Sequence, residues 1–244
     1  MFLAPDSGDY HLLPGSPCVD AGDMEAPALP EHDFEGDPRC CDGNCDGDAI
    51  ADMGTDEFRQ ARAPESWFVP GWVWFSIPLR PLAGWTEGSK LLGFDCTNRL
   101  YSWDDVGKSV LLYPNDFTQL FVGPSYLARL AAGEGYTPAY PGSQPAKSFP
   151  WTLAAAGWCW VGVPGEEDLV GTGLSVRRGK VTRTAAEDRD AADPWLNWNW
   201  VYWNPVAREA RIMNPFGGGD DTSLHPWYGY RVWSNTENVT IVFP

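Results

Sequence analysis

The chain has 244 residues, of which 43% are hydrophobic and 14% aromatic, so it can form a packed core in one large or two modest domains. Its formal net charge is −16 and its pI is about 4.4. This balance argues against nucleic acid and anionic membrane surfaces as partners, because both require clustered Lys and Arg. The sequence has no run of about 18 apolar residues, so we expect no membrane insertion.

The first predicted segment, residues 1–62, is rich in Asp, Gly and Pro. It contains GDYHLLPGSPCVDAGD at 8–23, DFEGDPR at 33–39 and DMGTDEF at 52–58. In this order the three pieces resemble the terminal segment of secreted bacterial right-handed parallel β-helix proteins. The resemblance implies a solenoid end whose body lies upstream, because one solenoid rung cannot bury its own face. We therefore expect a C-terminal fragment of a larger protein, with the export signal in the upstream sequence.

An Asp-rich run within this segment has the spacing of the first half of a calcium loop. Oxygen ligands at alternate positions, with Gly at the sixth for a sharp turn, suit a hard cation such as Ca²⁺. Met53 stands at the twelfth position in place of the bidentate Glu of an EF-hand, so flanking helices are not expected. The alternative is a solvated turn whose side chains cap their own backbone. The candidate metal ligands are Asp42, Asn44, Asp46, Asp48 and Asp52.

Six cysteines leave both disulfides and a zinc site open, and their even number suggests an exported protein. Cys40, Cys41 and Cys45 could bind Zn²⁺ together with His32 or His11, although their spacing is not a standard zinc pattern and Zn²⁺ is less favoured than Ca²⁺. The disulfide alternatives are Cys18 with one of those three, and Cys96 with Cys159.

Catalytic motifs are weak in this sequence. There is no Gly-x-Ser-x-Gly nucleophile elbow, and with 33 acidic residues paired carboxylates arise by chance. Arg39 is expected to form a buried structural ion pair with Asp20 or Asp23.

From residue 67 onward, alternating β-branched and aromatic residues bounded by Gly, Pro and Asn predict many short strands. Five strands are expected near 72–77, 109–113, 197–203, 230–233 and 238–243. Residues 125–132 could form a helix or a strand and turn, and a second short helix is expected over 184–192.

The sequence of this region contains an internal repeat. GWVWFSIP at 71–78 returns as GWCWVGVP at 157–164, LYSWD at 100–104 returns as VYWN at 201–204, and LAAGEGY at 130–136 returns as LHPWYGY at 224–230. The matches predict an internally duplicated all-β domain over residues 67–244, a sandwich or barrel with halves of about 67–150 and 151–244.

The repeated pieces resemble a duplicated β domain at the C-termini of many secreted bacterial proteins, whose signature is Gly-Trp-Asn-Leu-Ile-Ser-Ile-Pro, a Tyr-x-(Trp/Tyr)-Asp strand and Gly-(Glu/Gln)-Gly-(Tyr/Phe)-Trp. Trp74 and Thr137 depart from that pattern. The family has no single agreed activity, so the resemblance implies an architecture more than a function.

The tryptophans divide by repeat position. Trp72 with Trp158, and Trp103 with Trp203, recur in both copies and are expected in the core or between strands. Features that the two copies do not share are better candidates for function. These are the aromatic row at 198–202, the acidic loop between Lys180 and Trp195, and the loop at 217–221. Alternation places Trp198, Trp200 and Tyr202 on one strand face, which could stack on sugar rings or be the core face instead. The candidate ligand-binding residues are Trp198, Trp200, Tyr202 and Trp227.

These observations favour a non-catalytic accessory module of a secreted bacterial protein, extracellular or on the cell surface. It would bind a glycan or anchor its parent protein to a cell-surface component. The alternative is a hydrolase that uses a metal or acid–base chemistry on polysaccharide or small esters, in a cleft between the halves or at the Asp/Cys loop.

Overall fold

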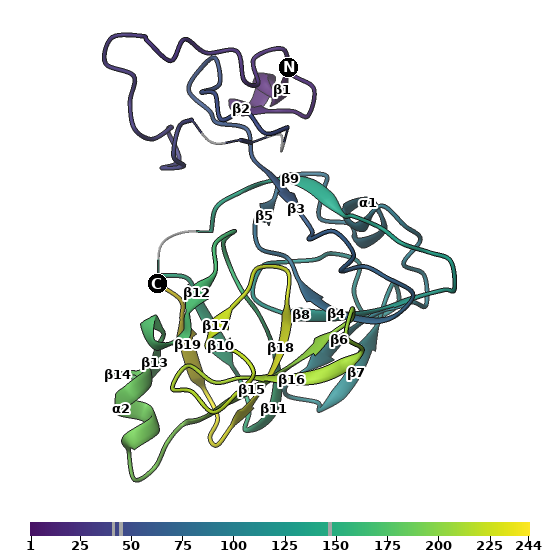
Figure 1. The fold of residues 1–244 in the computed structure, drawn as a ribbon, viewed down its shortest axis with the longest axis vertical. Helices are drawn as coiled ribbons and strands as arrows, with labels where there is room; N and C mark the ends of the chain where they lie inside the picture. Colours follow the sequence, from purple (N-terminus) through teal and green to yellow (C-terminus); the bar gives the residue numbers. More distant parts are fainter. Residues whose placement is uncertain (41, 44–45, 146–147) are drawn as a thin grey trace.

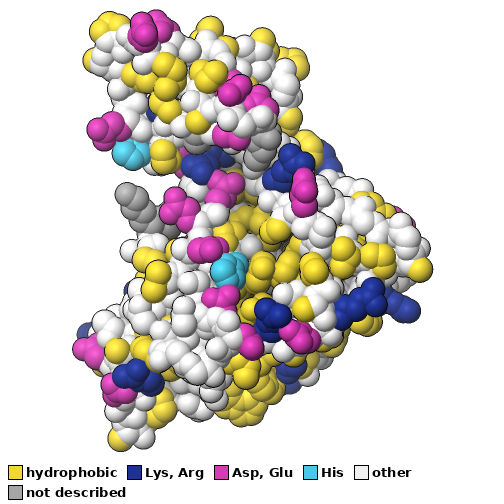
Figure 2. All heavy atoms as spheres, in the orientation of Figure 1, with side chains coloured by type: hydrophobic (Ala, Val, Ile, Leu, Met, Phe, Trp, Pro, Cys, Tyr) yellow, Lys and Arg dark blue, Asp and Glu magenta, His cyan; other side chains and the backbone are white. Residues whose placement is uncertain are grey.

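The computed structural model describes residues 1–40, 42–43, 46–145 and 148–244. They form an all-β protein in two parts, which we call the lobe (residues 1–58) and the body (residues 59–244). Figure 1 and Figure 2 show the lobe standing apart from the body, and Figure 1 shows that the stretch leading into β3 joins them. The lobe contains strand β1 (Phe2–Ala4), the 3-10 turn η1 (Pro5–Ser7) and strand β2 (Asp9–Leu12), with β1 and β2 antiparallel.

The body consists of antiparallel strands with two short helices. Its first half contains β3 (Gln60–Arg62), β4 (Gly71–Ser76), β5 (Arg80–Pro81), α1 (Gly88–Leu92), β6 (Leu100–Asp104), β7 (Ser109–Leu112), β8 (Ser125–Leu130) and β9 (Ala139–Ser143). Its second half contains β10 (Pro150–Leu153), β11 (Gly157–Gly162), β12 (Leu169–Val170), η2 (Gly171–Gly173), β13 (Ser175–Arg178), β14 (Val181–Thr184), α2 (Ala185–Asp190), β15 (Leu196–Asn204), β16 (Glu209–Met213), β17 (Ser223–Leu224), β18 (Gly229–Ser234) and β19 (Val239–Val242).

The two halves repeat one topology. A four-stranded sheet has the order β4-β8-β6-β7 in the first half and β11-β18-β15-β16 in the second, which is the same order of successive strands. The companion sheet β3-β9-β5 matches the first three strands of β10-β19-β13-β14. Because β3 pairs with β9, the duplicated unit begins near residue 60. This start lies inside residues 1–62, which the sequence predicted as a separate solenoid-end segment.

The halves meet through paired contacts that the duplication relates to each other. Ser76 N donates to Trp227 O at 3.0 Å, and the equivalent Gly162 N donates to Gly123 O at 2.6 Å. A Cβ on Gly162 would lie 2.5 Å from Pro124 O, so only glycine allows this approach. The equivalent Trp74 and Trp160 rings touch each other, with centroids 5.2 Å apart.

The third repeat match from the sequence is wrong in its register. Strand pairing aligns Tyr126 with Tyr230, because each lies at the second position of its strand. Both tyrosine hydroxyls accept a backbone N–H from five residues upstream, Phe121 N and His225 N respectively, each at 2.9 Å. The glycine and tyrosine at 133–136, which the sequence aligned with 227–230, belong to the turn after β8.

Each half has its own hydrophobic core. One cluster comes from residues 61–140 and the other from residues 153–243, with one exception. Trp227 is contributed by the second half but lies in the first core, where it contacts Phe68 and Tyr140 edge to face. The duplicated units are therefore interlocked as well as joined.

Of the two alternatives for residues 125–132 the strand is the correct one, and the second helix prediction is confirmed. Residues 125–130 form β8, which is hydrogen-bonded between β4 and β6, so tertiary pairing overrides the helix-favouring Leu, Ala and Arg residues. Helix α2 forms within 184–192 because Thr184 and Glu187 make a capping box. Among the described residues, no helix has the length and apolar character needed to cross a bilayer.

Candidate functional site

The aromatic row on β15 is buried. Trp198, Trp200 and Tyr202 are 4%, 0% and 3% exposed, and Trp227 is 3% exposed. On β15, Trp198 and Trp200 stack with ring centroids 6.2 Å apart, and Trp200 and Tyr202 pack on Tyr230. This row is the core face of its strand, so these rings do not form an exposed platform for sugars, and the prediction of such a platform does not hold.

The tryptophans shared by both copies are not among the buried core residues, but packing between strands is seen as expected, since Trp103 stacks on Trp160 with ring centroids 6.0 Å apart. Trp72 is 46% exposed, because Val73 and Phe75 are the residues of β4 that point into the core. Trp158 packs edge to face on Trp233, its partner on the neighbouring strand. Repetition in sequence thus marks strand position and not burial.

A pocket of about 310 Å³ lies on the second half where its unshared segments converge. The acidic loop contributes Arg189 and Pro194, β15 contributes residues 196–199, and the stretch after β16 contributes Asn214 and Phe216. Asn235, which follows β18, completes the lining. The segments that the first copy lacks or replaces therefore build one cavity.

The apolar part of the pocket is aromatic. Phe216 contacts Trp198 edge to face at 6.0 Å, and the Arg189 guanidinium stacks over the Phe216 ring at 4.1 Å. Arg189 is also paired with Asp190, with Nε 2.6 Å from the carboxylate. Its charge is therefore balanced, and the guanidinium acts mainly as a flat wall.

The polar part consists of neutral amides. Asn214 Nδ2 donates to Asn199 Oδ1 at 2.7 Å, and Asn235 Nδ2 donates to Pro194 O at 2.9 Å, which fixes two of the side chains. Among the described residues, Asn197 Nδ2, Asn199 Nδ2 and Asn235 Oδ1 have no protein partner. The pocket therefore offers both donors and an acceptor to a ligand.

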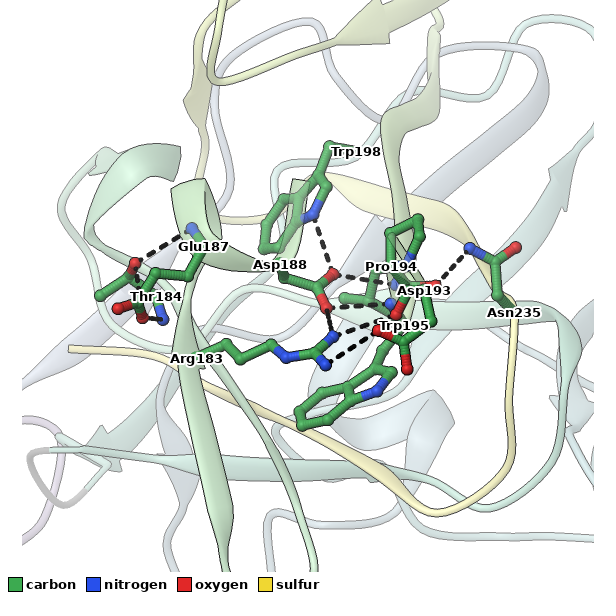
Figure 3. Close-up of polar contacts among 10 residues, drawn as sticks. Arg183, Thr184, Glu187, Asp188, Asp193, Pro194, Trp195, Trp198 and Asn235 are labelled. Atoms are coloured by element: carbon green, nitrogen blue, oxygen red, sulfur yellow. Dashed lines mark hydrogen bonds and ion pairs between the residues drawn. The ribbon is translucent and has the colours of Figure 1, made fainter. Parts of the chain in front are cut away.

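A buried carboxylate holds the wall of the pocket in place. Asp188, 0% exposed on α2, accepts hydrogen bonds from Trp195 N, Leu196 N and Trp198 Nε1 at 2.9–3.2 Å, and pairs with Arg183 at 3.2 Å. Figure 3 shows α2, β14 and the start of β15 converging on this group. With four partners Asp188 is a structural group and not a free acid or base.

Comparisons with known proteins do not assign a function to this site. No family model, curated protein or solved structure matches this chain. The chemistry of the pocket therefore follows from its own residues.

The described part of the predicted calcium loop caps its own backbone. Asp42 Oδ1 and Oδ2 accept Asp46 N and Gly47 N at 2.9 and 3.0 Å, and Asp46 Oδ1 accepts Asp48 N at 3.0 Å. Asp52 is buried and accepts Asp20 N at 2.7 Å. Asn44 lies outside the described residues, so the full predicted ligand set is not seen together.

The described cysteines are free thiols. Cys96 and Cys159 do not pair, because each is buried in the core of a different half, and burial raises the pKa of both thiols to about 12. Cys18 and Cys40 are also free. Cys41 and Cys45 lie outside the described residues, so the predicted cysteine zinc site is not described.

Arg39 forms its buried ion pair with a different partner from the predicted Asp20 or Asp23. Its Nε lies 3.7 Å from Glu57 Oε2, and its Nη2 donates to Asp52 O at 2.7 Å and Gly54 O at 2.9 Å. The contact is structural, as expected, but ties Arg39 to the 52–57 stretch.

His225 lies between two carboxylates on the second half. Its Nδ1 is 2.8 Å from Asp168 and its Nε2 is 2.6 Å from Asp221. Burial lowers the His225 pKa, but the hydrogen bonds to Asp221 and Asp168 outweigh it, so the net pKa is raised above 6.5. Both ring nitrogens are occupied, which makes His225 an ion-pair centre and not a catalytic base.

Sequence reasoning missed most of the pocket. Trp198 was predicted as a ligand contact, whereas Phe216 and the four Asn residues were not. What could have found them is their position in or beside segments that the first copy does not share.

Proposed function

We propose that this chain is a non-catalytic accessory module that binds a neutral glycan in the pocket of its second half. The observation that carries the proposal is the pairing of amide donors and acceptors with an aromatic wall in one cavity. Small-molecule ligands bind in pockets of roughly 300–1,000 Å³ that combine apolar surface with a few placed polar groups.

Charge supports a neutral ligand. The protein carries a net charge of −16, which disfavours anionic ligands in general. Among the described residues that line the pocket, Arg189 is the one cation, and it is already paired with Asp190. Asn side chains, by contrast, can donate to and accept from ring hydroxyls without a charge on either side.

The pocket favours binding over hydrolysis. No carboxylate is among the described residues that line it, whereas glycoside hydrolysis uses two carboxyl groups about 5–10 Å apart. The buried Asp188 beneath it is occupied by four partners. A hydrolase panel with and without EDTA tests the alternative: turnover that maps to this pocket would replace the proposal.

The wider setting belongs to the same proposal. A module of this kind fits a secreted bacterial protein, with the lobe as the end of an upstream solenoid and the body as an appended duplicated sandwich or barrel. The resemblances in residues 1–60 and 67–244 support that setting, and sequence upstream of Met1 would test it.

Binding is tested by titrating neutral and acidic oligosaccharides by calorimetry. Asn197→Ala removes a free amide and should weaken binding by about 2–13-fold, since one hydrogen bond contributes about 0.5–1.5 kcal/mol. Phe216→Ala should weaken it further by removing the aromatic wall. The matched control is Thr97→Ala at the equivalent position of the first half, which should bind like wild type.

Two results would contradict the proposal. One is the absence of binding to any neutral oligosaccharide by the wild type. The other is binding that Asn197→Ala and Phe216→Ala leave unchanged in proteins whose thermal unfolding matches the wild type.

A further inference from the structure

The lobe has very little apolar interior. Among its described residues, the buried apolar side chains are Leu12, Ala51 and Phe58, whereas the buried polar ones are Ser16, Asp37, Asp52, Asp56 and Glu57. Its described strands form one short antiparallel hairpin and one isolated bridge. Small units with so little core generally need another cross-link, such as a disulfide or a metal.

One cluster in the lobe has metal-ligand chemistry. A ring nitrogen of His11 and carboxylate oxygens of Glu35 and Asp56 all lie within 4.8 Å of one another. His11 is on β2, while Glu35 and Asp56 come from two separate irregular stretches. Three chain segments that share no strand pairing therefore present their ligand atoms to one point.

The surroundings orient these groups. Asp9 Oδ1 lies 2.6 Å from His11 Nδ1, which leaves Nε2 facing Glu35 at 2.8 Å. A carboxylate on the far nitrogen is the usual outer-shell partner of a metal-binding histidine, because it fixes the ring and its tautomer. Asp56 is held by Leu12 N, which donates to its Oδ2 at 2.6 Å. Two of the three candidate ligands are thus positioned by their neighbours.

We propose that His11, Glu35 and Asp56 bind one Zn²⁺ ion that cross-links the lobe. Two ligand atoms that each lie 2.0–2.2 Å from a tetrahedral Zn²⁺ are about 3.4 Å from each other. The ligand atoms of this cluster therefore need to move only by a fraction of an ångström to about an ångström to bind the ion. The imidazole favours zinc over Ca²⁺, which prefers oxygen ligands. The adjoining space, also lined by Phe58 and Arg59, is about 10 Å³, enough for about one water as fourth ligand and too small for a substrate.

The site would stabilise the contact between lobe and body. Arg59 beside it pairs with Asp37 of the lobe at 3.7 Å, and its Nε donates to Glu166 of the body at 3.2 Å. Zinc that fixes residues 11, 35 and 56 fixes the lobe side of this contact. Metal removal should then loosen the lobe while the body stays folded, since the two cores of the body lie outside the lobe.

The test uses the full chain with zinc alone. Wild type should bind one equivalent by calorimetry, with a higher melting temperature and slower proteolysis of the lobe. Glu35→Gln, at an exposed residue that should still fold, is expected to weaken binding at least tenfold. Asp9→Asn should weaken it about 10–100-fold through the histidine. His32→Ala and His225→Gln are the matched controls and should leave binding unchanged.

Co²⁺ substitution separates this site from the lobe cysteines. A His/carboxylate site gives a cobalt spectrum without a thiolate charge-transfer band, and a band of that kind would overturn the proposal. Equal zinc binding by Glu35→Gln and wild type, or no binding by the wild type, would also overturn it. A response to Ca²⁺ that Glu35→Gln leaves intact would belong to the Asp42–Asp52 loop.

Discussion

The two halves of the body share a framework and differ in what is attached to it. Strand β15 has nine residues where the equivalent β6 has five, and the described residues of the first half form no strand equivalent to β14. In the second half, Leu196 N donates a hydrogen bond to Asp188. At the corresponding position of the first half, Cys96 N donates to Ser89 Oγ at 3.1 Å. The shared parts are strand pairs and the unshared parts surround a pocket. On our proposal, the duplicated strands provide the scaffold and the additions provide the binding site.

The largest expected effect tests the inward face of β15. Trp200→Ala should lower the free energy of unfolding by about 3–5 kcal/mol, because Trp200 is fully buried in the second core. The matched control, Trp233→Ala at a ring 40% exposed on the outer face, should cost less than about 1 kcal/mol. Urea unfolding measures both, and equal losses would contradict the assignment of faces.

The next effect tests the buried carboxylate that distinguishes the halves. Asp188→Asn should cost about 1.5–3 kcal/mol, since it weakens charge-assisted hydrogen bonds to Arg183 and three N–H donors. Ser89→Ala, its counterpart in the first half, should cost about 0.5–1.5 kcal/mol. A larger loss for Ser89→Ala in chemical denaturation would reverse the comparison.

A smaller effect is the part of the pH dependence that His225 contributes in the second half. Since the His225 pKa is raised in the folded state, its ion pairs contribute stability that is fully present below pH 6.5 and lost as pH rises through the raised value. Phe121 stands at the equivalent position and cannot titrate. Melting temperatures from pH 5.5 to 9 should fall for wild type over that window.

His225→Phe, which copies the first half, should remove that part of the pH dependence. Asp168→Asn should reduce it, because one of the two carboxylates that raise the pKa is lost. An unchanged pH profile in His225→Phe would assign the dependence to other groups.

The sequence predicted the all-β class, the duplication and the strands near 72–77 and 197–203, because alternation and repeated motifs report strand position. It could not assign faces, since both faces of β4 and β15 carry aromatic residues: Trp72 points outward and Trp200 inward although both alternate. Neighbouring strands decide which face is covered, and that information is not local.

Sites whose residues lie far apart in the sequence could not be predicted from local sequence patterns for the same reason. His11, Glu35 and Asp56 lie in a segment with little regular structure, so no periodicity places them together. Asn214, which follows β16, and Asn235, which follows β18, both line the pocket. Their convergence depends on the sheet order, which only the tertiary structure shows.

We propose that the additions to the second half form a glycan-binding pocket. The most direct measurement is an NMR titration of the full chain with the best neutral oligosaccharide, following Asn side-chain amides and Trp indole N–H groups. We expect the region around Thr97 to stay unchanged and shifts to appear at Asn197, Asn199, Asn214, Asn235 and Trp198 Nε1–H. Shifts confined to the outer-face residues Trp72 and Trp233, or no shifts at all, would contradict it.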